Sequence, residues 1–170
     1  MARPIAATKV EFRLLGPLEV LVDGRSLRLS GAQQRALLSL LLLHANQPVS
    51  SDRLFEDLWG EDAPRTASAS LRVAVGKLRA LLGEEHRDRL ETVSGGYRLK
   101  VDAEELDSSR FEALVAEART LPPREALALL EQALALWNGP ALADVAYESF
   151  AQNEIRRLMD LQNQIRPGRR

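Results

Sequence analysis

The sequence predicts an α+β fold in which a winged helix-turn-helix domain is followed by a helical segment. Three observations predict it. Short alternating segments between residues 11 and 29 are interrupted by Gly16-Pro17 and Asp23-Gly24, as in a small antiparallel sheet. Apolar residues then recur at helical spacing up to residue 82, and two short strand-like segments flank Ser94-Gly95-Gly96. After residue 107 the pattern is purely helical.

The N-terminal sheet is expected to contain two strands within residues 11–22 and a third over residues 25–29. Ser30 then offers an N-cap for a helix over residues 30–45, with Gln33 in the capping-box position three residues later. The buried stripe of this helix is expected to be formed by Leu37, Leu38, Leu41 and Leu42.

Pro48 ends the first helix, because a proline pushes the preceding residue out of the helical region. A second helix is expected from Ser50-Ser51 and a third from Thr66. The third helix has a core stripe at i, i+4, i+7 and i+11, formed by Leu71, Val75, Leu78 and Leu82. Beside this stripe we expect Ser68, Arg72, Gly76 and Arg79 on one flank, with Lys77 on the other.

Residues 90–93 and 97–101 are predicted to pair as a hairpin after the third helix. A helix with exposed cations, followed by a two-stranded wing with Arg98 near its tip, is typical of winged helices that bind duplex DNA. We therefore predict a DNA-binding domain over residues 10–102.

Residues 107–165 are predicted to form a second, helical domain, interrupted at Pro122-Pro123 and at Asn138-Gly139-Pro140, with a last helix over residues 148–165. These helix pairs resemble tetratricopeptide-type hairpins, which bury their apolar faces by stacking. We expect them either to pack on the first domain or to begin a longer array. Phe111, Leu134 and Trp137 are expected to be buried there.

Charge divides along the same boundary. Residues 1–100 hold 15 Lys/Arg and 12 Asp/Glu, a net of +3, whereas residues 101–170 hold 8 and 12, a net of −4. This asymmetry favours phosphate contact by the first part only. The sequence has no cysteine and two isolated histidines, so we expect no metal site and no cofactor. No catalytic signature and no membrane or export segment is recognisable, which favours a cytoplasmic protein that is not an enzyme.

Several short motifs together resemble one family. Residues 31–38 (GAQQRALL), 44–50 (HANQPVS) and 58–60 (LWG) resemble the OmpR-type winged helix of Streptomyces antibiotic regulatory proteins (SARPs). Residues 133–137 (ALALW), 139–142 (GPAL) and 154–158 (EIRRL) look like the start of the bacterial transcriptional activation domain of that family.

The resemblance implies a transcription activator that binds tandem direct repeats as side-by-side protomers and recruits RNA polymerase, often at secondary-metabolite genes. It also implies that residues 60–65 face the polymerase, although a plain surface turn accounts for them almost as well. The helical part is shorter than a full activation domain, so a truncated or minimal variant is expected. Gly76 stands where the family usually carries a side chain.

The candidate interface can also be explained more simply, since cations on an amphipathic helix are most often only solvated. The wing favours DNA: Arg72 and Arg79 would contact base edges or phosphates, and Arg98 the minor groove or a phosphate. Serine hydroxyls at the helix start would contact phosphate, or would be ordinary helix-start residues. The expected DNA-binding residues are Thr66, Ser68, Ser70, Arg72, Gly76, Lys77, Arg79, Tyr97 and Arg98. The alternative function is a protein-interaction module that uses the helical hairpins.

Overall fold

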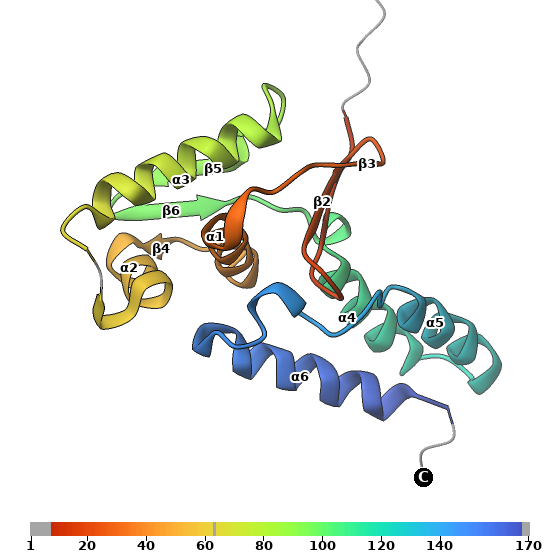
Figure 1. Cartoon of the computed structure of the whole chain (residues 1–170). Helices are drawn as coiled ribbons and strands as arrows, with labels where there is room; N and C mark the ends of the chain where they lie inside the picture. The colour runs from red at the N-terminus through yellow and green to blue at the C-terminus, as the bar shows by residue number, and fades with distance from the viewer. Residues whose placement is uncertain (1–7, 63, 168–170) are drawn as a thin grey trace, which may run out of the picture.

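The computed structural model, which describes residues 8–62 and 64–167, has the α+β architecture that the sequence predicts (Figure 1). An N-terminal sheet is formed by β1 (Val10–Arg13), β2 (Glu19–Val22) and β3 (Arg25–Ser26). The winged part adds α1 (Gly31–Leu43), β4 (Val49–Ser50), α2 (Ser51–Trp59), η1 (Gly60–Asp62), α3 (Ala67–Leu82), η2 (Arg87–Arg89), β5 (Leu90–Val93) and β6 (Gly96–Leu99). The helical part contains η3 (Ala103–Glu105), α4 (Asp107–Ala118), α5 (Pro123–Ala135), η4 (Ala143–Val145) and α6 (Ser149–Ile165).

The N-terminal sheet is antiparallel in the order β1-β2-β3. Asp23 and Gly24 both have positive φ, which fits a tight hairpin turn between β2 and β3. The third strand is shorter than the expected residues 25–29. Leu27 still donates its backbone N–H to the Val20 carbonyl at 2.8 Å, but the chain then leaves the sheet and Leu29 is buried in the core.

Helix α1 is buried on nearly every side, since residues 37–42 are all buried. The predicted capping box at Gln33 is wrong. The Oε1 atom of Gln34 accepts from the backbone N–H of Ser30 at 2.6 Å and from its hydroxyl at 3.0 Å, while Gln33 is exposed. Gln34 points inward from the first turn, so it is the side chain that can reach back to Ser30.

A second sheet has the order β4-β6-β5, and its strand β4 was not expected from the sequence. This two-residue strand pairs Val49 with Tyr97 and Ser50 with Gly96. Of the two adjacent glycines in the hairpin between β5 and β6, only Gly95 has the positive φ of a turn glycine. At Gly96 the reason for glycine is different, because a Cβ there would lie 2.0 Å from the Val49 carbonyl oxygen. Strand β4 therefore lies beside β6 at a position where no side chain fits.

Helices α2 and α3 form as predicted. The Ser50 hydroxyl accepts from the Arg53 backbone N–H at 3.1 Å and caps α2. The core stripe of α3 is buried at Leu71, Val75, Leu78 and Leu82, together with Ala67.

The helical part has its own small core. Phe111 of α4 is completely buried and meets the Trp137 ring edge-on, with centroids 5.4 Å apart. Leu134 and Trp137, which were also expected to be buried, are instead half-buried and line a surface hollow. The prolines also act differently from a simple break, because Pro123 is the first residue of α5, where its missing N–H costs nothing.

The helical part packs on the first part, which confirms one of the two expected arrangements. Leu15 lies in the helical core, and its carbonyl accepts from the Asn138 N–H at 2.7 Å. The buried Asp107 carboxylate accepts from the N–H groups of Leu14 and Leu15 at 2.7 and 3.0 Å. Helix α6 and η4 also contact α1 (Figure 1).

Candidate nucleic-acid interface

The exposed face of α3 carries cations on both flanks. Arg72 is exposed on one side and Lys77 on the other, with Gly76 and Val73 between them. Among the described residues, neither cation has an ion pair or a side-chain hydrogen bond. Both charges can therefore meet an anionic partner without breaking an existing contact.

Val73 also belongs to this face, although it is not among the DNA-binding residues expected from the sequence. Its side chain is 55% exposed, which is unusual for a large apolar residue of this protein. The position of Val73 on the helical wheel, opposite the core stripe, is the sequence feature that indicates its exposure. An exposed apolar side chain between two cations can contact the methyl group of thymine in a major groove.

Arg79 has structural partners that the sequence could not show. Its Nε donates to the Leu90 carbonyl at 2.9 Å, and one terminal nitrogen donates to the Thr92 hydroxyl at 2.9 Å. Strand β5 is an edge strand, so the guanidinium covers part of its open edge and ties α3 to the wing. The remaining N–H groups of Arg79 are still available for a phosphate.

Arg98 lies opposite Glu91 in the middle of the hairpin, and not at its tip. Its Nε donates to a Glu91 oxygen at 2.8 Å, and Lys100 Nζ lies 2.7 Å from the other oxygen. Hydrogen bonds from Lys100 and Arg98 lower the pKa of the Glu91 carboxyl. Arg98 is thus an ion-paired cation with a partly exposed guanidinium.

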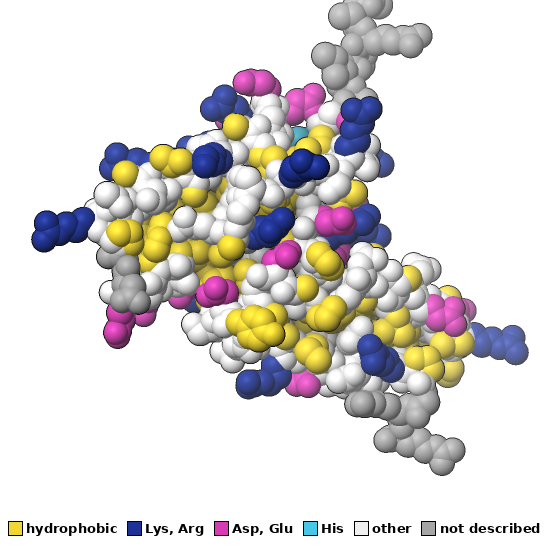
Figure 2. All heavy atoms as spheres, viewed as in Figure 1, with side chains coloured by type: hydrophobic (Ala, Val, Ile, Leu, Met, Phe, Trp, Pro, Cys, Tyr) yellow, Lys and Arg dark blue, Asp and Glu magenta, His cyan; other side chains and the backbone are white. Residues whose placement is uncertain are grey.

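A shallow polar cleft of about 470 Å³ joins these groups. Arg79 and Arg98 both line it, together with Arg87, Glu91 and Thr92. Arg72 lies two helical turns before Arg79 on the same flank of α3. The structure therefore brings the three predicted arginines to one continuous region. Figure 2 shows Lys and Arg side chains along the part of this face where Figure 1 draws α3.

The residues at the start of α3 are close to this face but form no cap. Thr66 is the N-cap residue without a side-chain cap bond, and its carbonyl accepts from the Ser70 N–H at 2.9 Å. Ser68 is exposed, whereas Ser70 lines a hollow of about 450 Å³ with Gln33 and Lys77. Free N–H groups and hydroxyls at a helix start can bind a phosphate.

Tyr97 and Gly76 are the two remaining residues that are expected from the sequence to contact DNA. Tyr97 pairs with Val49 on one side and Thr92 on the other, and its half-buried ring packs against the main core. Gly76 is exposed on α3, with open space where a Cβ would lie. Gly76 therefore allows a partner to approach the α3 backbone closely, whereas Tyr97 mainly supports the wing.

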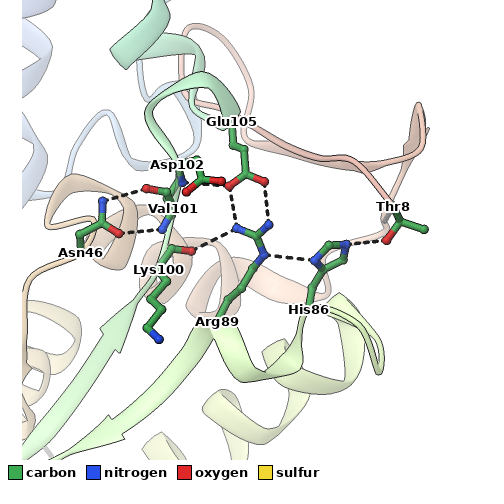
Figure 3. A network of polar contacts seen from close by, with 8 residues as sticks. All are labelled: Thr8, Asn46, His86, Arg89, Lys100, Val101, Asp102 and Glu105. Atoms are coloured by element: carbon green, nitrogen blue, oxygen red, sulfur yellow. Dashed lines mark hydrogen bonds and ion pairs between the residues drawn. The ribbon is translucent and has the colours of Figure 1, made fainter. Parts of the chain in front are cut away.

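A polar network fixes the base of the wing (Figure 3). Arg89 makes a bidentate pair with Glu105 at 2.6 and 2.7 Å, and its Nε donates to His86 Nδ1 at 3.1 Å. Asn46 and Val101 exchange two hydrogen bonds of 2.8 Å. His86, expected in an open charged loop, is instead buried, and its Nε2 lies 2.7 Å from the Thr8 hydroxyl. The wing is therefore joined rigidly to both the N-terminal segment and η3.

Clusters of metal-ligating side chains and membrane-spanning helices are absent from the described residues. In residues 8–62 and 64–167, no three His, Asp or Glu side chains gather closely enough to hold a metal ion. None of the described helices is long and apolar enough to cross a bilayer. The helical part has a hollow of about 530 Å³ lined by Leu134, Trp137, Met159 and Arg166.

Two protein-family models match consecutive stretches of the chain. Residues 24–99 match a family model described as transcriptional regulatory protein, C terminal, and residues 106–166 match the bacterial transcriptional activator domain. Regulatory protein AfsR of Streptomyces griseus is 35% identical over 95% of this chain and 17% of its own length. Transcriptional regulator RedD of Streptomyces coelicolor is 32% identical over 79% of this chain and 41% of its own.

A solved structure has the same fold. Mycobacterium tuberculosis EmbR, in complex with a low affinity phosphopeptide, superposes with a TM-score of 0.85 and 33% identity, covering 93% of this chain and 44% of EmbR. Transcriptional regulatory protein MoaR1 of Mycobacterium tuberculosis is 34% identical over 91% of this chain and 52% of MoaR1. The chain thus spans about half, or less, of the length of these relatives.

Proposed function

The chain belongs to the SARP family of transcriptional regulators, and we propose that it is a sequence-specific DNA-binding activator. It binds tandem direct repeats at promoters and recruits RNA polymerase, with genes of secondary metabolism as its targets. Residues 10–102 bind DNA, and residues 107–165 serve as the activation domain. These partners place the activity in the cytoplasm.

The exposed face of α3 is the observation that best supports this proposal. Arg72 and Lys77 lie on two flanks of a helix that packs beside a wing, and neither has an ion-pair partner in the part of the chain that the structure describes. A helix of this kind fits the major groove, where its flanks approach phosphates and its central residues approach base edges. Val73 would contact a thymine methyl, and Gly76 would allow close approach of the helix to the bases.

The wing and the start of α3 would supply the remaining contacts. Arg98 would bind a phosphate or the minor groove, with Tyr97 beside it, and Arg79 would bind a phosphate while holding the wing. Thr66, Ser68 and Ser70 would contact phosphate through hydroxyls and backbone N–H groups. Phosphate contacts position a protein on DNA, whereas base contacts select the sequence.

Selection of binding sites from random duplex DNA, followed by sequencing, tests this function directly. Arg72→Ala should then weaken binding to the selected site more than to random duplex, since a base contact carries about 1–3 kcal/mol of discrimination. Arg119→Ala removes an exposed arginine of the helical part and serves as the control. Equal losses on both duplexes would make Arg72 a phosphate contact, and absence of any enriched site would refute the function.

The assembly on DNA follows from the direct repeats. Repeats in the same orientation require head-to-tail contact between protomers, because a two-fold dimer matches inverted repeats. A footprint should therefore cover two sites in the same orientation. An inverted-repeat footprint would contradict this arrangement.

Polymerase recruitment is assigned to the helical part, whose net charge of −4 over residues 101–170 does not favour phosphate contact. Reconstituted transcription with RNA polymerase tests it. Substitution of exposed residues on α5 or α6, such as Leu127→Ser, should lower activation while leaving DNA affinity unchanged. If no exposed residue of these helices affects activation, another surface contacts the polymerase.

The alternative function is a protein-interaction module, which the apolar hollow beside Trp137 favours. The indole Nε1 of Trp137 is buried without a hydrogen-bond partner among the described residues, so a bound peptide carbonyl could reach it only after local movement. Salt distinguishes the two functions. DNA affinity falls steeply with salt through counterion release, whereas binding of a peptide to an apolar hollow responds weakly.

A further inference from the structure

We infer that Glu91 is a built-in competitor of DNA phosphate, which holds Arg98 and Lys100 while the wing is free and lowers the affinity of the wing for DNA. The inference rests on the proposed DNA-binding function. It assigns a role to an acidic residue that lies among the cations of the candidate interface.

A single carboxylate, that of Glu91, forms ion pairs with two cations, Arg98 and Lys100. Glu91 and Arg98 are direct cross-strand partners on β5 and β6, and Lys100 follows two residues after Arg98. The two carboxylate oxygens are divided between them, with Arg98 Nε at 2.8 Å and Lys100 Nζ at 2.7 Å. In the described residues, neither cation has another acidic partner.

These contacts are exposed enough to exchange. The side chains of Arg98 and Lys100 are 36% and 59% exposed, and ion pairs in such surroundings are weak and screened by salt. Duplex DNA presents a dense row of negative charges, so its phosphates can replace a single carboxylate as the partner of both cations.

The cleft beside the wing is where a phosphate could replace Glu91 as the partner of Arg98. Arg98 shares this cleft with Arg79, whose guanidinium is fixed by Leu90 and Thr92 and has no anionic partner within residues 8–62 and 64–167. A phosphate that enters the cleft meets both guanidinium groups, and it also meets the negative charges of Asp88 and of Glu91, of which Glu91 is the one paired with Arg98. Removing the charge of Glu91 should therefore strengthen phosphate binding without any change of fold.

The test uses Glu91→Gln in the full chain, since glutamine keeps the shape and removes the charge. Affinity for duplex DNA at 0.1 M salt should rise about threefold to tenfold, by a similar factor for selected and random sequences because phosphates carry no sequence information. The slope of log K against log salt should become steeper by about one unit, because the substitution removes one negative charge that offsets the cations of the wing.

Glu19→Gln is the matched control, because Glu19 also pairs with an arginine, Arg13, but in the N-terminal sheet. It removes the same charge and should leave DNA affinity unchanged. In an Arg98→Ala/Lys100→Ala background, Glu91→Gln should have no larger effect than this control. Thermal melting shows whether each variant is folded, and Glu91→Ser provides a second folded variant with the same expected direction.

The outcomes separate the two levels of the proposal. If the unmodified chain binds duplex DNA with a steep salt dependence but Glu91→Gln and Glu91→Ser bind no more tightly, Glu91 only braces the hairpin and the inference is overturned. An equal gain for Glu19→Gln would overturn it as well, since net charge alone would then be responsible. If the unmodified chain binds no duplex at any salt concentration, the proposed function itself fails.

Discussion

Asp107 offers the sharpest test of how the two parts of the protein are joined. Strand β1 ends at Arg13, and the next two N–H groups, of Leu14 and Leu15, have no strand partner. Both residues are buried, so their N–H groups need an acceptor inside the protein. The Asp107 carboxylate, at the start of α4, accepts from both at 2.7 and 3.0 Å.

Asp107→Ala would leave two buried donors without an acceptor. Each unpaired donor costs about 1–3 kcal/mol, which gives about 2–6 kcal/mol for the pair. The substitution also removes a buried carboxyl group, and this burial raises the pKa of Asp107 despite hydrogen bonds from Leu14, Leu15 and Ser108. Relief of that desolvation offsets part of the loss. We expect the free energy of unfolding to fall by about 2–4 kcal/mol.

Equilibrium urea denaturation measures this loss, provided that the slope with denaturant is unchanged. Asp160→Ala, which removes an exposed aspartate of α6, is the control and should change the free energy of unfolding by less than about 0.5 kcal/mol. Asp107→Asn keeps one acceptor oxygen and should fall between the two. A loss for Asp107→Ala as small as that of the control would refute the argument, because the two N–H groups would then have another acceptor.

Three further predictions follow. Folding raises the pKa of Asp107 above its ordinary value of 3.8. At pH values just above 3.8 the folded chain therefore binds more protons than the unfolded chain. The unfolding free energy of the unmodified chain should consequently fall, relative to Asp107→Asn, as the pH rises through this range. Urea denaturation at pH 3.5–6 (roughly the range of carboxyl titration) measures this difference. A rise of the unfolding free energy relative to Asp107→Asn over this range would contradict the prediction. Gly96→Ala should cost about 1–3 kcal/mol by driving Val49 away, whereas Gly76→Ala, in open space on a helix, should stabilise by about 0.5–1 kcal/mol; equal melting shifts would refute this contrast. Ser50→Ala should cost about 1 kcal/mol through loss of the α2 cap, and an unchanged melting temperature would show that the cap contributes nothing.

Local pattern was enough to predict the elements that carry the candidate interface. The core stripe of α3 follows from a period of 3.6 residues, and this period also places Arg72 and Lys77 on exposed flanks. The hairpin follows from a turn glycine, Gly95, between two short apolar segments. The assignment of Arg72, Lys77 and the other predicted residues to DNA contact remains a prediction.

Contacts between distant segments were decided only by the tertiary structure. Strand β4 is too short for any periodicity, and the need for glycine at position 96 appears only when Val49 lies against it. The partners of Arg98 and the burial of His86 depend equally on which segments meet.

The sequence by itself determined where the main helices and the strands other than β4 form and which side of α3 is polar, because these depend on neighbours within a few residues. The tertiary structure decided that Arg79 holds the wing, that Glu91 holds two cations, and that Asp107 joins the two parts. A charged side chain looks the same in the sequence whether it is solvated, ion-paired or buried. Its state depends on the groups that folding places within hydrogen-bonding distance of it.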